Sequence, residues 1–337
     1  MINTPFLSIC ILTFNRSEKL NKLLINIKEQ IKTFDNKNKI EILVADNCST
    51  DNTEEIVNIC KFYFTDTNLK YYKHLINIGA DKNTDFLYRN ASGKYVWLMA
   101  DNVILKENAV SIVYNLLLDY QPSAMLFSYI QGETFTLEKP TFNIPNPVDS
   151  FTNYEQAIRI IFQSPKISIY VIKKEFLDKK DDFILNSYLD TNYYHVTLML
   201  YIFFISETHS LLVYREPLVR SYSDCLNLRY SPRTFGKIKW AISLPHIVNN
   251  YPKIINDIQI DYDDTILSFL IADKLGNIQL DASVKEEESK WAYSNIRKLL
   301  VKKNTRLLLL YFILLNSPVK WIITSSGFCK LFHIAKT

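Results

Sequence analysis

Glycine is scarce in this 337-residue sequence, which contains only six. Neither G-x-G-x-x-G nor G-x-x-x-x-G-K-[ST] occurs, so the sequence has no Rossmann dinucleotide loop and no P-loop. So few glycines also exclude collagen-like and glycine-rich repeat proteins. These absences remove the commonest glycine-built phosphate sites.

Cysteine is also sparse and unpaired. The five cysteines are scattered, and no C-x-x-C pair is present. Because disulfide frameworks and zinc sites need grouped cysteines, neither is expected, and a reducing compartment is favoured. The N-terminus lacks a basic segment followed by an apolar one, so we expect no secretory signal. The sequence therefore predicts a cytoplasmic protein.

Acidic residues are absent from the last part of the chain, residues 289–337, which carry nine lysines and arginines. The apolar run at 307–315 is too short to cross a bilayer, which needs about 20 apolar residues. The upstream basic residues and Trp321 favour a helix in the membrane interface over a packed C-terminal helix. No basic recognition motif indicates nucleic-acid binding.

Apolar runs and helical periodicity alternate along the first half of the chain, which has an ordinary globular composition with 22% charged residues. Four runs predict strands, at residues 6–13, 40–45, 69–73 and 94–99. Four segments predict helices, one after Ser17 as N-cap, one after Asp51 and Glu54 in capping-box spacing, and two at 81–91 and 107–120. This alternation predicts an α/β fold with a mostly parallel sheet flanked by helices.

The second half of the chain is less regular. We expect strands at 124–130, 168–173 and 211–214, a helix at 153–163 and a loop at 133–149. Strand patterns stop near 225–230, and helical ones follow. The expected organisation is an α/β domain at 1–228, divided into halves at 1–108 and 109–228, and a helical basic region at 229–337.

Polar residues follow three of the predicted strands. They are Thr13 and Asn15, Asp46 and Asn47, and Asp101 and Asn102. Ligands of parallel sheets bind beyond the carboxyl ends of the strands, so these residues form the candidate site. The Asp46 carboxylate can accept a nucleobase N–H or bond a ribose hydroxyl. Asp101 could hold Mg²⁺ or Mn²⁺ through oxygen, and such a metal would stabilise the charge of a diphosphate.

Structural interpretations of the same residues stay open. Asp46 and Asn47 are also common turn residues. Asp101 also suits the connection to a following helix, and Asp51 suits a helix cap better than a ligand.

Four segments, in order and with fitting spacing, resemble family 2 glycosyltransferases of the GT-A fold. They are LSICILTFNR (7–16), ILVADNCSTDNT (42–53), NIGADKN (77–83) and ASGKYVWLMADN (91–102). The last segment looks most like the abequosyltransferase-like subgroup, whose members build bacterial surface polysaccharides. The resemblance implies an inverting transfer of a sugar from a nucleotide-diphosphate donor to a hydroxyl of a lipopolysaccharide, lipooligosaccharide or capsule precursor.

The resemblance also implies roles for single residues. Asp46 matches the aspartate that contacts the donor base, and Thr13 stands where the family lines the nucleoside pocket. Asp101 matches the last aspartate of the D-x-D-type motif, which binds the metal. The chain has Ala100-Asp101-Asn102 there, so only one carboxylate is available, and the expected cation site is weakened. Lys82 is expected to supply further positive charge to the diphosphate.

An inverting transferase needs a general base to take the proton of the acceptor hydroxyl. The family places this base, an aspartate, roughly ninety residues after the metal motif, where Asp190 stands in this chain. Asp181 and Asp182 are nearby competitors, and His195 is a weaker candidate. Asp190 as a helix N-cap and His195 as a core histidine are the structural alternatives.

The reduced metal motif leaves a second hypothesis, a catalytically impaired GT-A homologue that binds nucleotides or serves as an assembly subunit. Under the first hypothesis, the expected partners are a nucleotide-sugar donor, a saccharide acceptor that a lipid can carry, and a membrane surface bound through the basic tail. The expected location is the inner face of the cytoplasmic membrane.

Overall fold

The computed structural model describes only part of the chain. The described residues are 4–64, 68–131, 134–135, 141–142, 144–153, 156–157, 160–161, 166–178, 189, 194–205 and 209–221. The chain divides into two units, Met1–Asp224 and Cys225–Thr337, and the described residues belong to the first. The expected boundary at 228/229, the basic tail and Asp190 with its competitors Asp181 and Asp182 lie outside the described residues.

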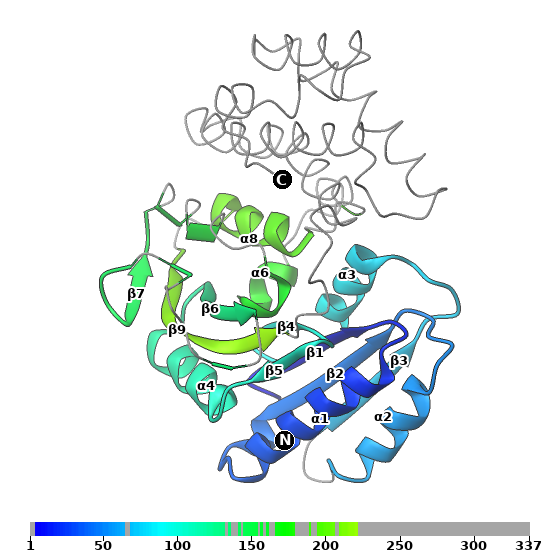
Figure 1. Cartoon of the computed structure of the whole chain (residues 1–337). Coiled ribbons are helices and arrows are strands. Elements are labelled where there is room, and N and C mark those ends of the chain that lie inside the picture. The colour runs from blue at the N-terminus through cyan, green and yellow to red at the C-terminus, as the bar shows by residue number, and fades with distance from the viewer. Residues whose placement is uncertain are drawn as a thin grey trace, which may run out of the picture. The chain divides into compact units, whose positions relative to one another are not determined.

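One sheet of nine strands organises the described part of the chain (Figure 1). Its order is β3-β2-β1-β4-β8-β6-β9-β5, and β7 pairs with β9. The bounds are β1 Leu7–Thr13, β2 Ile40–Asp46, β3 Asn68–Lys73, β4 Tyr95–Ala100, β5 Val103–Leu105, β6 Ala124–Gln131, β7 Val148–Phe151, β8 Tyr170–Lys173 and β9 Leu211–Ser221.

The sheet is parallel in its first half and mixed in its second. Strands β3, β2, β1 and β4 all pair in parallel. Strand β8 then joins β4 and β6 antiparallel, while β6 and β9 pair in parallel. Strands β5 and β7 both pair antiparallel with β9. The expectation of a mostly parallel sheet thus holds as far as β4, and beyond it the sheet is mixed.

The central strands are buried because helices cover both faces of the sheet. Every residue of β2 is buried, as are all but one of β1. Continuous apolar runs of this kind are typical of parallel strands with two covered faces.

The four helices of the first half begin and end close to the predicted positions, whereas the helices at 174–178 and 194–205 were not predicted. Their bounds are α1 Ser17–Lys32, α2 Thr53–Lys61, α3 Ala80–Asn90, α4 Ala109–Tyr120, α6 Lys174–Asp178 and α8 Tyr194–Ile205. The buried face of α1 consists of the five predicted residues, Leu20, Leu23, Leu24, Ile27 and Ile31. None of the helices in the described ranges is both long and apolar enough to cross a membrane.

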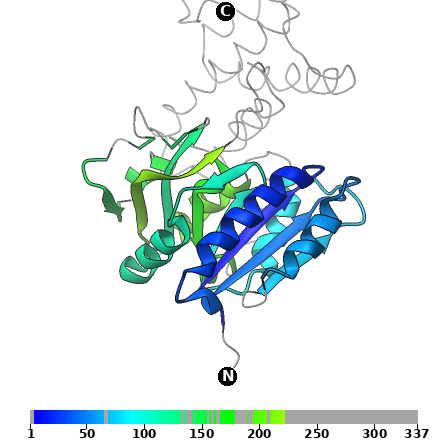
Figure 2. The same ribbon diagram turned by 60° about the horizontal axis from the view of Figure 1, so that its bottom comes forward.

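The order of the strands determines which face each helix covers. The chain moves outward from β1 to β2 to β3, so right-handed crossovers place α1 and α2 side by side on one face. It then returns from β3 to β4, on the other side of β1, so α3 packs against β1 and β2 from the opposite face (Figure 2). The strand order therefore reverses between β1 and β4. Open α/β sheets bind ligands beyond the carboxyl ends of strands at such a reversal.

Several local predictions were wrong, each because a distant segment decides the structure. Ser17 is the first residue of α1 rather than its N-cap, and its N–H donates to the Asp51 carboxylate at 2.9 Å. The capping box of Asp51 and Glu54 does not form, since Glu54 pairs instead with Lys73 at 3.0 Å. Asp51 lies one residue before the N-cap, Asn52, and accepts the N–H of Thr53, the first residue of α2, at 3.2 Å.

Two strands were not predicted from the sequence pattern. Strand β5 precedes α4 in the first half, and β7 begins within the predicted loop at 133–149. Both are short and exist through their antiparallel pairing with β9, which itself runs seven residues beyond the predicted end at 214. Residues 167–169 form a 3₁₀ turn before β8 rather than part of a strand at 168–173. The predicted helix at 153–163 lies partly outside the described residues.

Candidate functional site

Thr13, Asp46 and Asp101 meet at the carboxyl ends of β1, β2 and β4. The Thr13 hydroxyl donates to Asp101 Oδ2 at 2.9 Å. Thr13 also stands opposite Asp46 in the parallel pairing of β1 with β2, and its carbonyl accepts the Asn47 N–H at 3.0 Å. All three side chains are buried. The strand-end residues therefore belong to one rim at the reversal of strand order.

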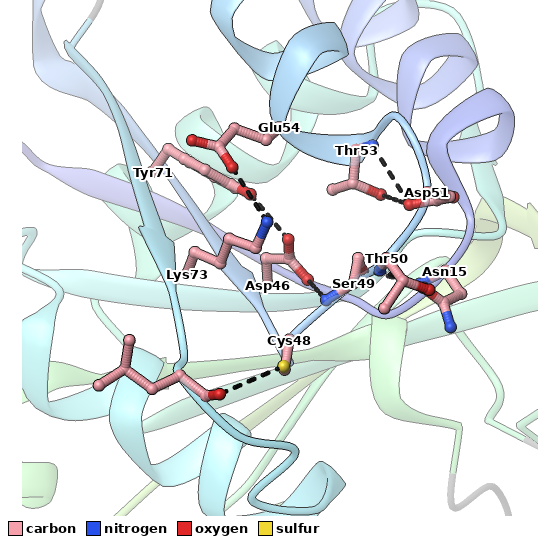
Figure 3. A network of polar contacts seen from close by, with 11 residues as sticks. Asn15, Asp46, Cys48, Ser49, Thr50, Asp51, Thr53, Glu54, Tyr71 and Lys73 are labelled. Atoms are coloured by element: carbon pink, nitrogen blue, oxygen red, sulfur yellow. Dashed lines mark hydrogen bonds and ion pairs between the residues drawn. The ribbon is translucent and has the colours of Figure 1, made fainter.

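The Asp46 carboxylate is held from both sides (Figure 3). Its Oδ1 accepts the backbone N–H of Ser49 at 2.8 Å, and its Oδ2 accepts the Tyr71 hydroxyl at 2.7 Å. Burial raises the pKa of Tyr71 far above its ordinary value, and the hydrogen bond to Asp46 raises it further. Tyr71 is therefore a protonated donor at any physiological pH, and Asp46 has a fixed orientation.

Tyr71 is a site residue that the sequence did not reveal. It lies on β3 two positions before Lys73, which is the register partner of Asp46. Diagonal neighbours on adjacent strands are within reach of an aromatic side chain. The contact could be found only with the register of β2 and β3, which no local pattern specifies.

Asn47 fastens the connection between β3 and α3. Its Oδ1 accepts the Ile78 N–H at 2.8 Å, and its Nδ2 donates to Asn77 Oδ1 at 2.7 Å. Gly79 ends this connection with a φ of 83°, a conformation that glycine adopts without strain. Lys82 follows in the first turn of α3, where it is exposed. Asn47 thus positions the segment that carries Lys82.

Asn15 ties the end of β1 to the end of β2 (Figure 3). It has a left-handed backbone with a φ of 50°, which asparagine tolerates better than most residues. Its Oδ1 accepts the Thr50 N–H at 2.8 Å, and its own N–H donates to Ser49 Oγ at 2.8 Å. Ser49 in turn donates its N–H to Asp46. The two loops after β1 and β2 are therefore a single hydrogen-bonded unit.

Asp101 forms an ion pair with Arg16. Arg16 Nη1 lies 3.0 Å from Asp101 Oδ1, and the side chain of Arg16 is 45% exposed whereas that of Asp101 is 2% exposed. Burial raises the pKa of Asp101, and the charge and hydrogen bond of Arg16 and the hydrogen bond of Thr13 act against this shift. Arg16 therefore supplies the counter-charge of a carboxylate that is buried away from water.

The rim as it stands does not fit the expected Mg²⁺ or Mn²⁺ site. Both oxygens of Asp101 already accept hydrogen bonds, from Thr13 and Arg16. Ala100 offers no ligand, and Asn102 offers only an amide oxygen. Within the described ranges, no group of three or more His, Cys, Asp or Glu side chains could hold a metal ion. A divalent cation at Asp101 would also stand beside the Arg16 guanidinium and be repelled by it.

His195 lies in α8 and is 3% exposed. Its ring packs edge-on against Tyr170 of β8, with 5.0 Å between centroids. The preceding residue, Tyr194, donates its hydroxyl to Asp85 of α3 at 2.7 Å. His195 therefore occupies an interior position between α8 and the sheet, in agreement with the structural alternative. Asp190, the base candidate, lies outside the described residues, and its role stays a prediction.

This architecture belongs to the GT-A class of α/β folds. Two S. aureus TarS structures align with it, each at a TM-score of 0.58 and 15% identity. The complex with UDP covers 79% of this chain and 80% of its own, and the complex with UDP-GlcNAc covers 78% and 73%. The mannosyltransferase PcManGT of Pyrobaculum calidifontis, in complex with GDP-Man and Mn²⁺, aligns at a TM-score of 0.50 and 12% identity, covering 98% of this chain and 84% of its own.

Sequence comparison relates the chain to one family of this class. Residues 8–175 match the model of Glycosyl transferase family 2. Abequosyltransferase RfbV of Salmonella typhimurium is 29% identical over 215 residues, which are 58% of this chain. The match spans 61% of the length of RfbV. The predicted resemblance to family 2 and its abequosyltransferase-like members is thereby confirmed.

Proposed function

We propose that this protein is an inverting glycosyltransferase. It transfers a sugar from a nucleotide-diphosphate donor to a hydroxyl group of a bacterial surface-glycan precursor. The observation that carries the proposal is the joining of Thr13, Asp46 and Asp101 at the β1/β4 reversal of a family 2 domain. The abequosyltransferase RfbV supports polysaccharide synthesis as the setting, and the neighbours solved with UDP, UDP-GlcNAc and GDP-Man support a nucleotide-sugar donor.

The donor lies across the carboxyl ends of β1, β2 and β4. Asp46 stands nearest the base or the ribose: its carboxylate is fixed by Ser49 and Tyr71, and each oxygen keeps a second lone pair that can accept a hydrogen bond from the donor. Thr13 and Asp101 lie toward the diphosphate, and Lys82 adds positive charge from α3. Asn15 and Asn47 keep the connecting loops in place.

The reaction needs one proton acceptor on the acceptor side. The acceptor oxygen forms a bond to the anomeric carbon from the face opposite the leaving group, so the configuration inverts. The bond from that carbon to the phosphate oxygen breaks, and its electron pair leaves with the nucleoside diphosphate. Asp190 takes the hydroxyl proton as general base.

The catalytically impaired homologue is the weaker alternative. It rested on Ala100, and the comparisons favour a transferring enzyme, because the curated relative is a transferase by name. The neighbour PcManGT was solved with Mn²⁺, and the rim described above does not fit such a cation, so the assay below is run with and without Mn²⁺.

We also propose that the protein works in the cytoplasm and binds the membrane surface through residues 289–337. Loss of vesicle co-sedimentation on deletion of 307–337 is the expected result.

Donor hydrolysis by the full-length protein tests the proposed function. The purified chain is incubated with UDP-, GDP-, CDP- and dTDP-sugars, and released nucleoside diphosphate is measured with and without Mn²⁺. Asp46→Ala should abolish the release. Asp35→Ala is the matched control, because Asp35 is an exposed carboxylate between α1 and β2, at the other end of the strands. Equal release by both variants would contradict the proposal.

A further inference from the structure

We propose that Arg16 binds the pyrophosphate of the donor and supplies the positive charge that a metal ion provides where two carboxylates are present. Donor binding by this chain then does not require a divalent cation. The inference rests on the proposed function, because it concerns the same donor. It goes beyond that function by assigning the diphosphate contact to a side chain.

The position of Arg16 suits this role. It follows the end of β1 by three residues and immediately precedes α1. Its guanidinium reaches across to Asp101, the residue directly after β4, with a separation of 3.0 Å. The cation is therefore held at the reversal of strand order, where sheets of this kind bind their ligands.

The pairing with Asp101 leaves most of the guanidinium available. A guanidinium carries five N–H donors in a planar fork, and the contact with Asp101 is made through Nη1. The side chain remains 45% exposed, so Arg16 is accessible to a ligand from solvent. Such a fork matches the oxygens of a phosphate group bidentately. Arg16 can therefore hold a diphosphate while it stays paired with Asp101.

Asp101 acts in this arrangement as a positioning residue. It is itself fixed by the Thr13 hydroxyl and accepts a hydrogen bond from the guanidinium of Arg16. Of the nearby lysines, Lys73 pairs with Glu54 at 3.0 Å, and Lys82 is exposed on the first turn of α3 as a compact point charge on a flexible stem. Arg16 is better placed than either because its orientation is set by a buried carboxylate.

Isothermal titration of the full-length protein with UDP, GDP and CDP tests the inference, each in Mn²⁺ and in EDTA. We expect the wild type to bind at least one of them with an affinity that changes less than about twofold on removal of the metal. Arg16→Gln should weaken that binding by about tenfold or more, whereas affinity for the matching nucleoside without phosphates should stay unchanged. Arg16→Lys should lie between the two, since it keeps the charge and loses the fork.

Lys32→Gln is the matched control. It removes one positive charge from the exposed last turn of α1, the helix that Arg16 precedes, and its binding should equal that of the wild type. Circular dichroism verifies that the Arg16 variants are folded. If Arg16→Gln is not folded, the affinity of Arg16→Lys is compared with that of the wild type instead. Wild-type binding that disappears in EDTA, or an Arg16 variant that binds like Lys32→Gln, would overturn the role of Arg16 alone. Failure of the wild type to bind any of the three nucleotides would overturn the proposed function as well.

Discussion

Removal of the Tyr71 hydroxyl should disturb Asp46 without changing any other group of the rim. In Tyr71→Phe, Asp46 Oδ2 loses the hydrogen bond of 2.7 Å, and only the Ser49 N–H remains. A hydrogen bond to a charged group contributes about 1.5–3 kcal/mol, and a fully buried carboxylate has no water to replace it. We take about 2 kcal/mol as the expected loss.

This loss has two measurable consequences. For a unit of about this size, 1 kcal/mol corresponds to roughly 2–4 °C in Tm, so Tyr71→Phe should unfold about 4–8 °C below the wild type. Asp46 also becomes free to turn, so affinity for the donor nucleotide should fall, by at most the factor of roughly 30 that 2 kcal/mol represents. Thermal unfolding by circular dichroism and nucleotide titration measure the two effects.

Tyr72→Phe provides the matched comparison. Tyr72 is the next residue of β3, and its ring packs edge-on against Phe86 at 5.2 Å. Its hydroxyl has no hydrogen-bond partner among the contacts within the described residues, so its removal should change Tm by less than about 1 °C. If Tyr71→Phe and Tyr72→Phe have the same Tm and the same nucleotide affinity, Tyr71 does not position Asp46.

Three further predictions concern other parts of the chain. Gly93→Ala should destabilise the fold by about 1–3 kcal/mol in urea unfolding, since its Cβ would lie 2.7 Å from the Ser8 backbone nitrogen. Asp51 has a pKa below the ordinary 3.8, since hydrogen bonds from Thr53 and Ser17 outweigh the opposite effect of burial. Stability should therefore fall as the pH drops from about 4 through that lowered value, and Asp51→Asn should remove this dependence. Asp190→Asn should reduce kcat at least about a hundredfold, with little change in donor affinity.

Each of these has a result that would contradict it. An unfolding midpoint of Gly93→Ala equal to that of the wild type would mean that the backbone near Ser8 can shift to make room for the added methyl group. Identical acid unfolding of Asp51→Asn and the wild type would remove Asp51 from the pH response, with Asp35→Asn as the exposed control. A normal turnover rate of Asp190→Asn would assign the proton transfer to another residue.

The Arg16–Asp101 pair supplies the counter-charge of the single carboxylate in the Ala100-Asp101-Asn102 segment. A single buried carboxylate needs a counter-charge, and burial alone raises its pKa. In this chain the counter-charge is the guanidinium of Arg16, from the segment that follows β1. The one carboxylate of the reduced motif and the guanidinium of Arg16 therefore form an ion pair.

Local patterns alone were enough to predict the first four strands and helices of the fold, but not strand β5 or the helix caps. Strands β1, β2, β3 and β4 are continuous apolar or β-rich runs, and the buried stripe of α1 repeats with the helical period. Both signals depend only on neighbouring residues. The strand-end positions of Thr13, Asp46 and Asp101 follow from the same runs, because a parallel sheet brings its carboxyl ends to one edge.

Tertiary structure decided which side chains meet at that edge. Ser17 and Asp51 are 34 positions apart, Tyr71 and Asp46 are 25 apart, and Arg16 and Asp101 are 85 apart. Strand β7 likewise exists only through its pairing with β9. These contacts depend on strand register and on side-chain directions that are set when the sheet assembles, and no window of neighbouring residues contains that information.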